Sequence, residues 1–115
     1  MKVYNIEAAN VDLIFTKGDT INLTFDDITL NGVAYDMTGF QIDIHVRRKD
    51  GLLIRSFTTS GGSPEISIVT DSFTMYSTTA FDKAGDYEYD VQVNDLTNTY
   101  TIIKGNLYVE KEQTL

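Results

Sequence analysis

The chain has 115 residues, no cysteine, and a formal net charge of −8 from 9 Lys+Arg and 17 Asp+Glu residues. This length fits one domain with a single core. The absence of cysteine excludes disulfides, thiolate metal sites and cysteine nucleophiles, and the negative charge disfavours binding to nucleic acid or to anionic membranes through the bulk surface.

The first ten residues contain no candidate for a secretory signal, because they lack an apolar core of the length that such a signal needs. No apolar run further along approaches the roughly 18 residues of a membrane-spanning helix. Val3, Tyr4 and Ile6 nevertheless precede the main strand pattern. We expect residues 1–10 to form either an arm that docks on a neighbouring subunit or an ordinary edge strand of the same domain.

From residue 11 onward, the apolar residues repeat with period two, which indicates strands with one buried and one exposed face. The segments 20–25, 40–48 and 87–93 show this pattern most clearly. Their apolar positions are Ile21, Leu23 and Phe25, then Phe40, Ile42, Ile44 and Val46, and finally Tyr87, Tyr89, Val91 and Val93.

Turn residues separate these segments at intervals of about eight to twelve residues. Asn31-Gly32 is a strong signal for a two-residue hairpin, in which both central positions take positive φ. Asp50-Gly51 is expected to form the same turn between two neighbouring strands. Gly105 is expected to allow a bulge or a bend in the last strand.

The pattern predicts about eight or nine short strands and no long helix. The expected fold is all-β, an antiparallel Greek-key β-sandwich of the immunoglobulin-like kind, since two packed sheets bury the apolar faces of such strands. A small, partly open barrel is the alternative. Residues 11–110 are expected to form this domain, with residues 1–10 as the N-terminal arm or edge strand and residues 111–115 as a C-terminal tail.

The sequence around Tyr87 predicts a tyrosine corner, a structural motif of such sandwiches. Gly85 is followed by one spacer residue and then by Tyr87, which opens a strand. We expect the Tyr87 phenol to form a hydrogen bond to the backbone a few residues upstream. Tyr89 occupies the position at which an antibody domain has a cysteine, so we expect its ring to fill the core there. All three residues are predicted to be structural.

His45 is the one histidine of the chain, on the polar face of its predicted strand. A histidine base needs a nucleophile or an orienting partner, and none is close in the sequence. We therefore expect His45 to be a surface residue, although a Ser-His-Asp arrangement assembled from distant residues is recognised only by its geometry.

Asp86, Glu88 and Asp90 project from one face of one predicted strand. They could form a site for a divalent cation, since such cations collect carboxylate oxygens. They could equally form an exposed sheet face that Arg47 or Arg55 partly neutralises from a neighbouring strand, and the lack of a calcium-loop motif favours this second interpretation. The sequence predicts no catalytic residues, no cofactor and no metal site.

Several segments, taken in order, carry a resemblance to a known family. They are Lys17-Gly18-Asp19-Thr20 before an Ile-x-Leu-x-Phe strand, the segment 35–40, the Asp50-Gly51 hairpin, the strand 84–93 and the segment 101–109. Their order and spacing resemble the N-terminal domain of tailed-phage upper baseplate proteins and similar small virion proteins. These proteins have an immunoglobulin-like or related β-sandwich fold.

This resemblance implies a structural protein of the virion, made in the host cytoplasm, that holds fibre, baseplate or capsid components together without catalysis. The expected partners are other virion proteins or a second or third copy of the chain, and neither nucleic acid nor a membrane. Because the sequence ends shortly after the domain, a capsid-decorating head protein is an alternative to a tail or baseplate component.

A carbohydrate-binding module is an alternative of another class, which a row of exposed tyrosines at Tyr76, Tyr100 and Tyr108 would favour. A small hydrolase would need a close pair of carboxylates in a pocket.

Overall fold

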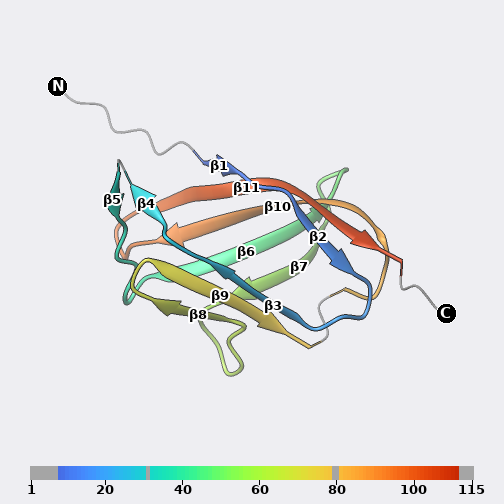
Figure 1. The fold of residues 1–115 in the computed structure, drawn as a ribbon, viewed down its shortest axis with the longest axis horizontal. Coiled ribbons are helices and arrows are strands. Elements are labelled where there is room, and N and C mark those ends of the chain that lie inside the picture. The colour runs from blue at the N-terminus through green and yellow to red at the C-terminus, as the bar shows by residue number, and fades with distance from the viewer. Residues whose placement is uncertain (1–7, 31, 79–80, 112–115) are drawn as a thin grey trace.

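The computed structural model describes residues 8–30, 32–78 and 81–111. Within these ranges every regular element is a β-strand and no helix is present, which confirms the predicted all-β class. The strands in Figure 1 are β1 (Ala9–Asn10), β2 (Leu13–Thr16), β3 (Ile21–Phe25), β4 (Thr29–Leu30), β5 (Val33–Ala34), β6 (Gln41–Arg48), β7 (Leu53–Thr58), β8 (Ile66–Val69), β9 (Ser72–Ser77), β10 (Gly85–Asn94) and β11 (Thr99–Glu110).

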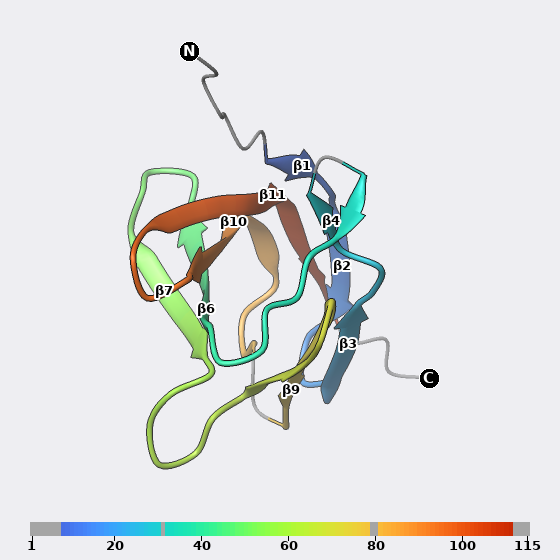
Figure 2. The ribbon, with the colours of Figure 1, turned by 90° about the vertical axis from the view of Figure 1, so that its left-hand side faces the viewer.

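Two sheets face each other across the core (Figure 2). The larger sheet has the order β1-β11-β10-β6-β7, and β2 also pairs with β11. The smaller sheet has the order β3-β9-β8, and β4 pairs with β5 as a separate hairpin. Most pairs are antiparallel, whereas β1 and β2 run parallel to β11. The described strands form open sheets and no barrel, so the alternative of a partly open barrel is wrong.

The predicted alternation of buried and exposed residues is confirmed on the central strands. Ile42, Ile44 and Val46 of β6 point into the core and are at most 1% exposed. On the opposite sheet the rings of Phe25 and Phe73 stack with centroids 4.7 Å apart. Burying a side chain of this size contributes about 1.5–3 kcal/mol, so the facing rows of apolar residues hold the two sheets together.

The hydrogen bond expected of Tyr87 is present. Its phenol donates to the carbonyl oxygen of Lys83, four residues upstream, at 3.1 Å. Gly85 makes room for this ring, because a Cβ there would lie 3.2 Å from the Tyr87 hydroxyl oxygen. The Tyr89 side chain is buried, and its phenol donates to the carbonyl oxygen of Val11. Both tyrosines thus combine a ring in the core with a polar end that is hydrogen-bonded.

A two-residue loop joins β4 to β5, because Leu30 pairs directly with Val33. Gly32 takes φ +78°, as the predicted hairpin turn requires. Asn31, the other residue of the predicted turn, lies outside the described residues.

The prediction of the same two-residue turn at Asp50-Gly51 is wrong. The Arg48 N–H donates to the Leu52 carbonyl at 2.9 Å, so residues 49–51 form a three-residue loop. Of the pair, only Gly51 takes positive φ, at +94°. The Asp50 carboxylate accepts hydrogen bonds from Leu52 N–H at 3.2 Å and from the Arg48 guanidinium at 2.6 Å. A three-residue hairpin loop with glycine in the left-handed region is a common solution.

The predicted bulge does not lie at Gly105, which is part of the continuous strand β11. The register with β10 shifts instead at Ile102. Glycine is needed at position 105 for close approach, because a Cβ there would lie 2.1 Å from the Val11 carbonyl oxygen. The backbone that joins β1 to β2 therefore passes directly over Gly105.

Only part of the predicted N-terminal arm is described. Ala9–Asn10 pairs with Ile103 and Lys104 of β11 as an edge strand. Residues 1–7 lie outside the described residues, as do residues 112–115 of the predicted C-terminal tail.

Candidate functional site

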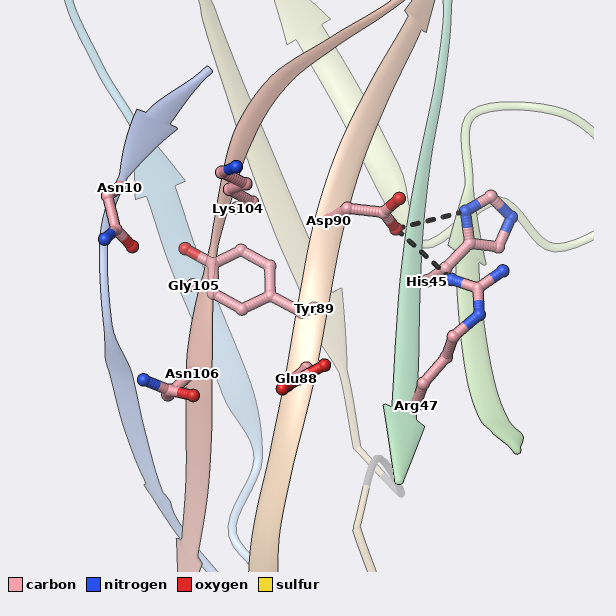
Figure 3. A pocket seen from close by; sticks show the side chains of 9 residues that line it. All are labelled: Asn10, His45, Arg47, Glu88, Tyr89, Asp90, Lys104, Gly105 and Asn106. Carbon is pink, nitrogen blue, oxygen red and sulfur yellow. Dashed lines mark ion pairs between the residues drawn. The ribbon is translucent and has the colours of Figure 1, made fainter. Parts of the chain in front are cut away.

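An open depression of about 440 Å³ lies on the outer face of the larger sheet (Figure 3). Strands β1, β11, β10 and β6 all contribute to it, since alternate residues of each strand point away from the core. Its polar lining consists of Asn10, His45, Arg47, Glu88, Asp90, Lys104 and Asn106, with Tyr89 and Gly105 between them.

Asp90 lies at the centre of this lining. Strand β10 runs between β6 and β11, so Asp90 is paired across the sheet with His45 on one side and Lys104 on the other. Asp90 Oδ1 is 3.5 Å from His45 Nδ1 and 3.5 Å from Arg47 Nη1. The Oδ1 and Nδ1 atoms are buried and make no hydrogen bond with a described residue. Nearby positive charge from Arg47 therefore offsets the cost of burying this carboxylate oxygen.

His45 lies on the outer face of the larger sheet, as its place on the polar face of the strand predicts, and its side chain is 24% exposed. Its partner Asp90 comes from a distant part of the sequence, and no local pattern indicates the contact. Ser56 lies opposite His45 on β7 and extends the same row. No hydrogen bond among the described residues joins Ser56 to His45, so the nucleophile–base contact of a triad is missing.

The acidic residues of β10 do not converge on one point. Lys49 Nζ lies 3.5 Å from Glu88 Oε1 and donates to the side-chain oxygen of Asn106 at 2.7 Å. Within the described residues, no three His, Asp or Glu side chains come together as they would around a metal ion. Asp86, Glu88 and Asp90 therefore form one acidic row on a face of the sheet where positive and negative rows alternate.

Tyr89 is part of the lining, but its phenol is already engaged with the Val11 carbonyl. Burial, with a smaller contribution from the Asp12 carboxylate, raises the pKa of Tyr89 to about 12. This phenol consequently stays protonated near neutral pH. The other residues that line the depression carry no hydroxyl or thiol. The arrangement is suited to non-covalent binding of a polar or charged surface.

The tyrosines that a carbohydrate platform would need do not form a row. Tyr76 is on β9 of the smaller sheet and is 51% exposed. Tyr100 and Tyr108 are on β11 of the larger sheet, and Tyr100 packs against the core. These three rings therefore cannot present one flat surface to a sugar.

Arg55 connects the two sheets at a different place. Its guanidinium donates to Glu65 Oε2 at 2.6 Å and to the Ser77 hydroxyl at 3.3 Å, and it lies 4.4 Å from the centre of the Phe57 ring. Of the two arginines expected to neutralise the acidic residues of β10, Arg47 contacts Asp90, whereas Arg55 pairs with Glu65.

Glu65→Gln is expected to lower the free energy of unfolding at neutral pH by about 1 kcal/mol. Burial disfavours the charged form, but the hydrogen bonds from Arg55 and Ser77 and the charge of Arg55 outweigh it and lower the pKa of Glu65. A lowered pKa stabilises the folded state above the unfolded-state value near 4.5, and this stability is lost as the pH falls through the folded-state pKa.

Urea unfolding between pH 3 and pH 7 measures this effect, and the variant is expected to show a weaker loss of stability on acidification. Glu88→Gln is the matched control, because the Glu88 side chain is 58% exposed and its contact with Lys49 is 3.5 Å long. An equal loss of stability on acidification in wild type and Glu65→Gln would show that the Glu65 carboxylate does not cause this loss.

Comparison of the chain with protein-family models and with curated proteins gives no match. Within the described ranges, no helix is long and apolar enough to cross a membrane.

Proposed function

We propose that this chain is a non-enzymatic structural module of a tailed-phage particle, which holds fibre, baseplate or capsid components together by binding other virion proteins. The segments that resemble upper baseplate proteins support this role by their order and spacing. The strand arrangement supports it as well, because it fits the immunoglobulin-like Greek key that the resemblance implies.

The order of the strands is the observation that carries the proposal. In variable-type immunoglobulin domains, one sheet contains strands G, F, C and C′, and the other contains strands B, E and D. The order β11-β10-β6-β7 fits the first sheet, and β3-β9-β8 fits the second. The bond from Tyr87 to Lys83 lies at the start of β10, which is where strand F has its tyrosine corner.

The depression around Asp90 favours binding over catalysis. Its charged groups are held by neighbouring strands, and its one phenol is hydrogen-bonded to backbone. Charged rows on a rigid sheet confer specificity and speed of encounter more than affinity, which suits a module that recognises particular neighbours. The separation of Tyr76 from Tyr100 and Tyr108 gives a carbohydrate-binding role no support.

Analysis of purified particles of the phage that encodes this chain tests the proposal. Quantitative mass spectrometry is expected to find the chain in a fixed ratio to the major structural proteins, with a replication enzyme of the same phage as the negative control. Electron cryo-microscopy at residue resolution is expected to show the domain in contact with other virion proteins, in the head or in the tail. Particles that are complete and infectious but lack the chain would refute the role.

A further inference from the structure

Consecutive apolar side chains are exposed where β7 begins. Leu52 is 56% exposed, Leu53 is 47% exposed and Ile54 is 37% exposed. The other large apolar side chains exposed among the described residues are separated along the sequence. Exposed apolar surface commonly marks a contact site, and two of these side chains, Leu52 and Ile54, line the same cleft.

A cleft of about 370 Å³ adjoins this segment. Leu52 and Ile54 form part of its wall, and the buried rings of Phe81 and Tyr87 form its floor. These two rings stack with centroids 6.4 Å apart and an interplanar angle of 16°. Figure 1 shows that the start of β7 and the start of β10 lie at the same end of the molecule. The cleft can therefore hold one large apolar side chain.

The rim of the cleft is rich in charged side chains. Arg48, Arg55 and Lys83 line it together with one acidic residue, Asp82. A chain with 9 Lys+Arg and a net charge of −8 thus places three of its cations around one cleft.

Two of these cations already have a carboxylate partner. Arg48 pairs with Asp50 and Arg55 pairs with Glu65, each at 2.6 Å. Lys83 makes no ion pair with a described residue. A carboxylate of a bound molecule could pair with the Lys83 ammonium without displacing an existing partner.

The backbone of β7 is poorly suited to accept an added strand. The carbonyl of Ser56 accepts a hydrogen bond from the Arg55 guanidinium at 2.9 Å, and the carbonyl of Thr58 accepts one from the Glu65 N–H at 3.1 Å. The register with β6 also shifts at the start of the strand, between its pairings through Arg55 and Leu53. Capped carbonyls and a bulge both protect an edge against strand pairing. Recognition at this place therefore depends on side chains.

We propose that the cleft between the start of β7 and Phe81 is a docking site for a segment of another protein that carries a large apolar residue next to acidic residues. The apolar side chain packs against Ile54 and Phe81, and a neighbouring carboxylate pairs with Lys83. This site deepens the proposed role as an interaction module. Its test is separate, because the cleft can bind such a segment whether or not the chain occurs in particles.

A titration of the ¹⁵N-labelled chain with a blocked Gly-Glu-Leu-Glu-Gly peptide at low ionic strength tests the site. Amide shifts are expected to change at residues 52–55 and 81–83. The same peptide with lysines in place of glutamates is expected to bind at least threefold more weakly. Lys83→Gln is expected to weaken binding of the acidic peptide about twofold to fivefold, as an exposed ion pair would, and Ile54→Thr about fivefold to tenfold.

Two variants serve as matched controls. Lys111→Gln removes an exposed lysine that lines neither the cleft nor the depression, and Val69→Thr changes a 73% exposed valine on β8. Both are expected to leave peptide binding unchanged. Lys83→Gln keeps the carbonyl that accepts the Tyr87 hydrogen bond, so it is expected to fold normally.

Three results would overturn the proposal: equal binding of both peptides, shift changes confined to other surfaces, or equal weakening by Lys83→Gln and Lys111→Gln. Sedimentation of the chain alone is the remaining check. Self-association that Ile54→Thr abolishes would identify a second copy of the chain as the occupant and would refute a foreign partner. A negative peptide result would leave the particle role standing, and absence from particles would leave the docking site standing.

Discussion

Gly105→Ala is expected to lower the free energy of unfolding by about 2–4 kcal/mol. The added Cβ would lie 2.1 Å from the Val11 carbonyl oxygen and 3.1 Å from Asp12 Oδ1. The first of these atoms belongs to backbone and cannot rotate away. The segment that joins β1 to β2 would therefore have to move off β11.

Moving this segment would break several hydrogen bonds. Val11 N–H donates to the Lys104 carbonyl at 2.9 Å, and the Asn106 N–H donates to Asp12 Oδ1 at 3.0 Å. The bond from Tyr89 to the Val11 carbonyl would also be strained. Since Asn10 and Asn106 line the depression, the change is expected to alter the candidate site as well as stability.

Urea unfolding followed by circular dichroism measures the loss for Gly105→Ala. Gly62→Ala is the matched control, because a Cβ at position 62 meets no atom within 4 Å. The control is expected to change the free energy of unfolding by less than about 1 kcal/mol. A midpoint for Gly105→Ala equal to that of wild type would show that β1 can shift without cost and would contradict the close approach described above.

Tyr89→Phe is expected to lower the free energy of unfolding by about 2 kcal/mol. The variant keeps the ring in the core but removes the hydroxyl that donates to the Val11 carbonyl. A carbonyl left without its partner in a partly buried place costs about 1–3 kcal/mol. Tyr76→Phe is the control, since the Tyr76 side chain is 51% exposed. Equal stability of both variants would show that the Tyr89 hydroxyl contributes nothing.

The same hydroxyl makes stability depend on alkaline pH. Burial, followed by the Asp12 carboxylate, raises the pKa of Tyr89 from 10.0 to about 12 in the folded chain. The folded state therefore holds this proton more tightly than the unfolded state. The resulting stability is fully present below pH 10 and is lost as the pH rises toward 12.

Two measurements check this dependence. Spectrophotometric titration of the folded chain is expected to show a tyrosine that ionises near pH 12 and is missing in Tyr89→Phe. Urea unfolding between pH 9 and pH 11.5 is expected to show a smaller loss of stability in the variant than in wild type. A variant that loses as much stability as wild type over this range would assign the alkaline effect to another group.

The class of the fold could be predicted because its signal is local. Successive side chains of a strand point to opposite faces, so the alternation in 40–48 and 87–93 already separates buried from exposed positions. The hydrogen bond from the Tyr87 phenol to the Lys83 carbonyl could also be predicted from the sequence, because donor and acceptor are four residues apart. Turn residues predict the length of a loop less well. Asp50-Gly51 is part of a three-residue loop, in which the Asp50 carboxylate accepts hydrogen bonds from the Leu52 N–H and the Arg48 guanidinium.

The candidate site depends on contacts that join distant parts of the chain. Asp90 meets His45 because β10 pairs with β6, and the cleft forms because β7 begins near the Phe81 connection. No spacing of residues in the sequence indicates that Asp90 meets His45 or that β7 begins near Phe81. The sequence places His45 on the outward face of its strand, but it does not indicate that the Asp90 carboxylate lies beside it.

The period-two pattern of apolar residues is enough to predict an all-β chain and the buried face of each central strand, because side-chain direction along a strand follows from backbone geometry alone. The neighbours of each strand follow from the packing of the folded chain. This packing places Gly105 under the Val11 carbonyl, Asp90 beside His45 and Arg55 in contact with Glu65. Such contacts depend on the order of strands in the sheets, and that order results from the packing of the whole chain.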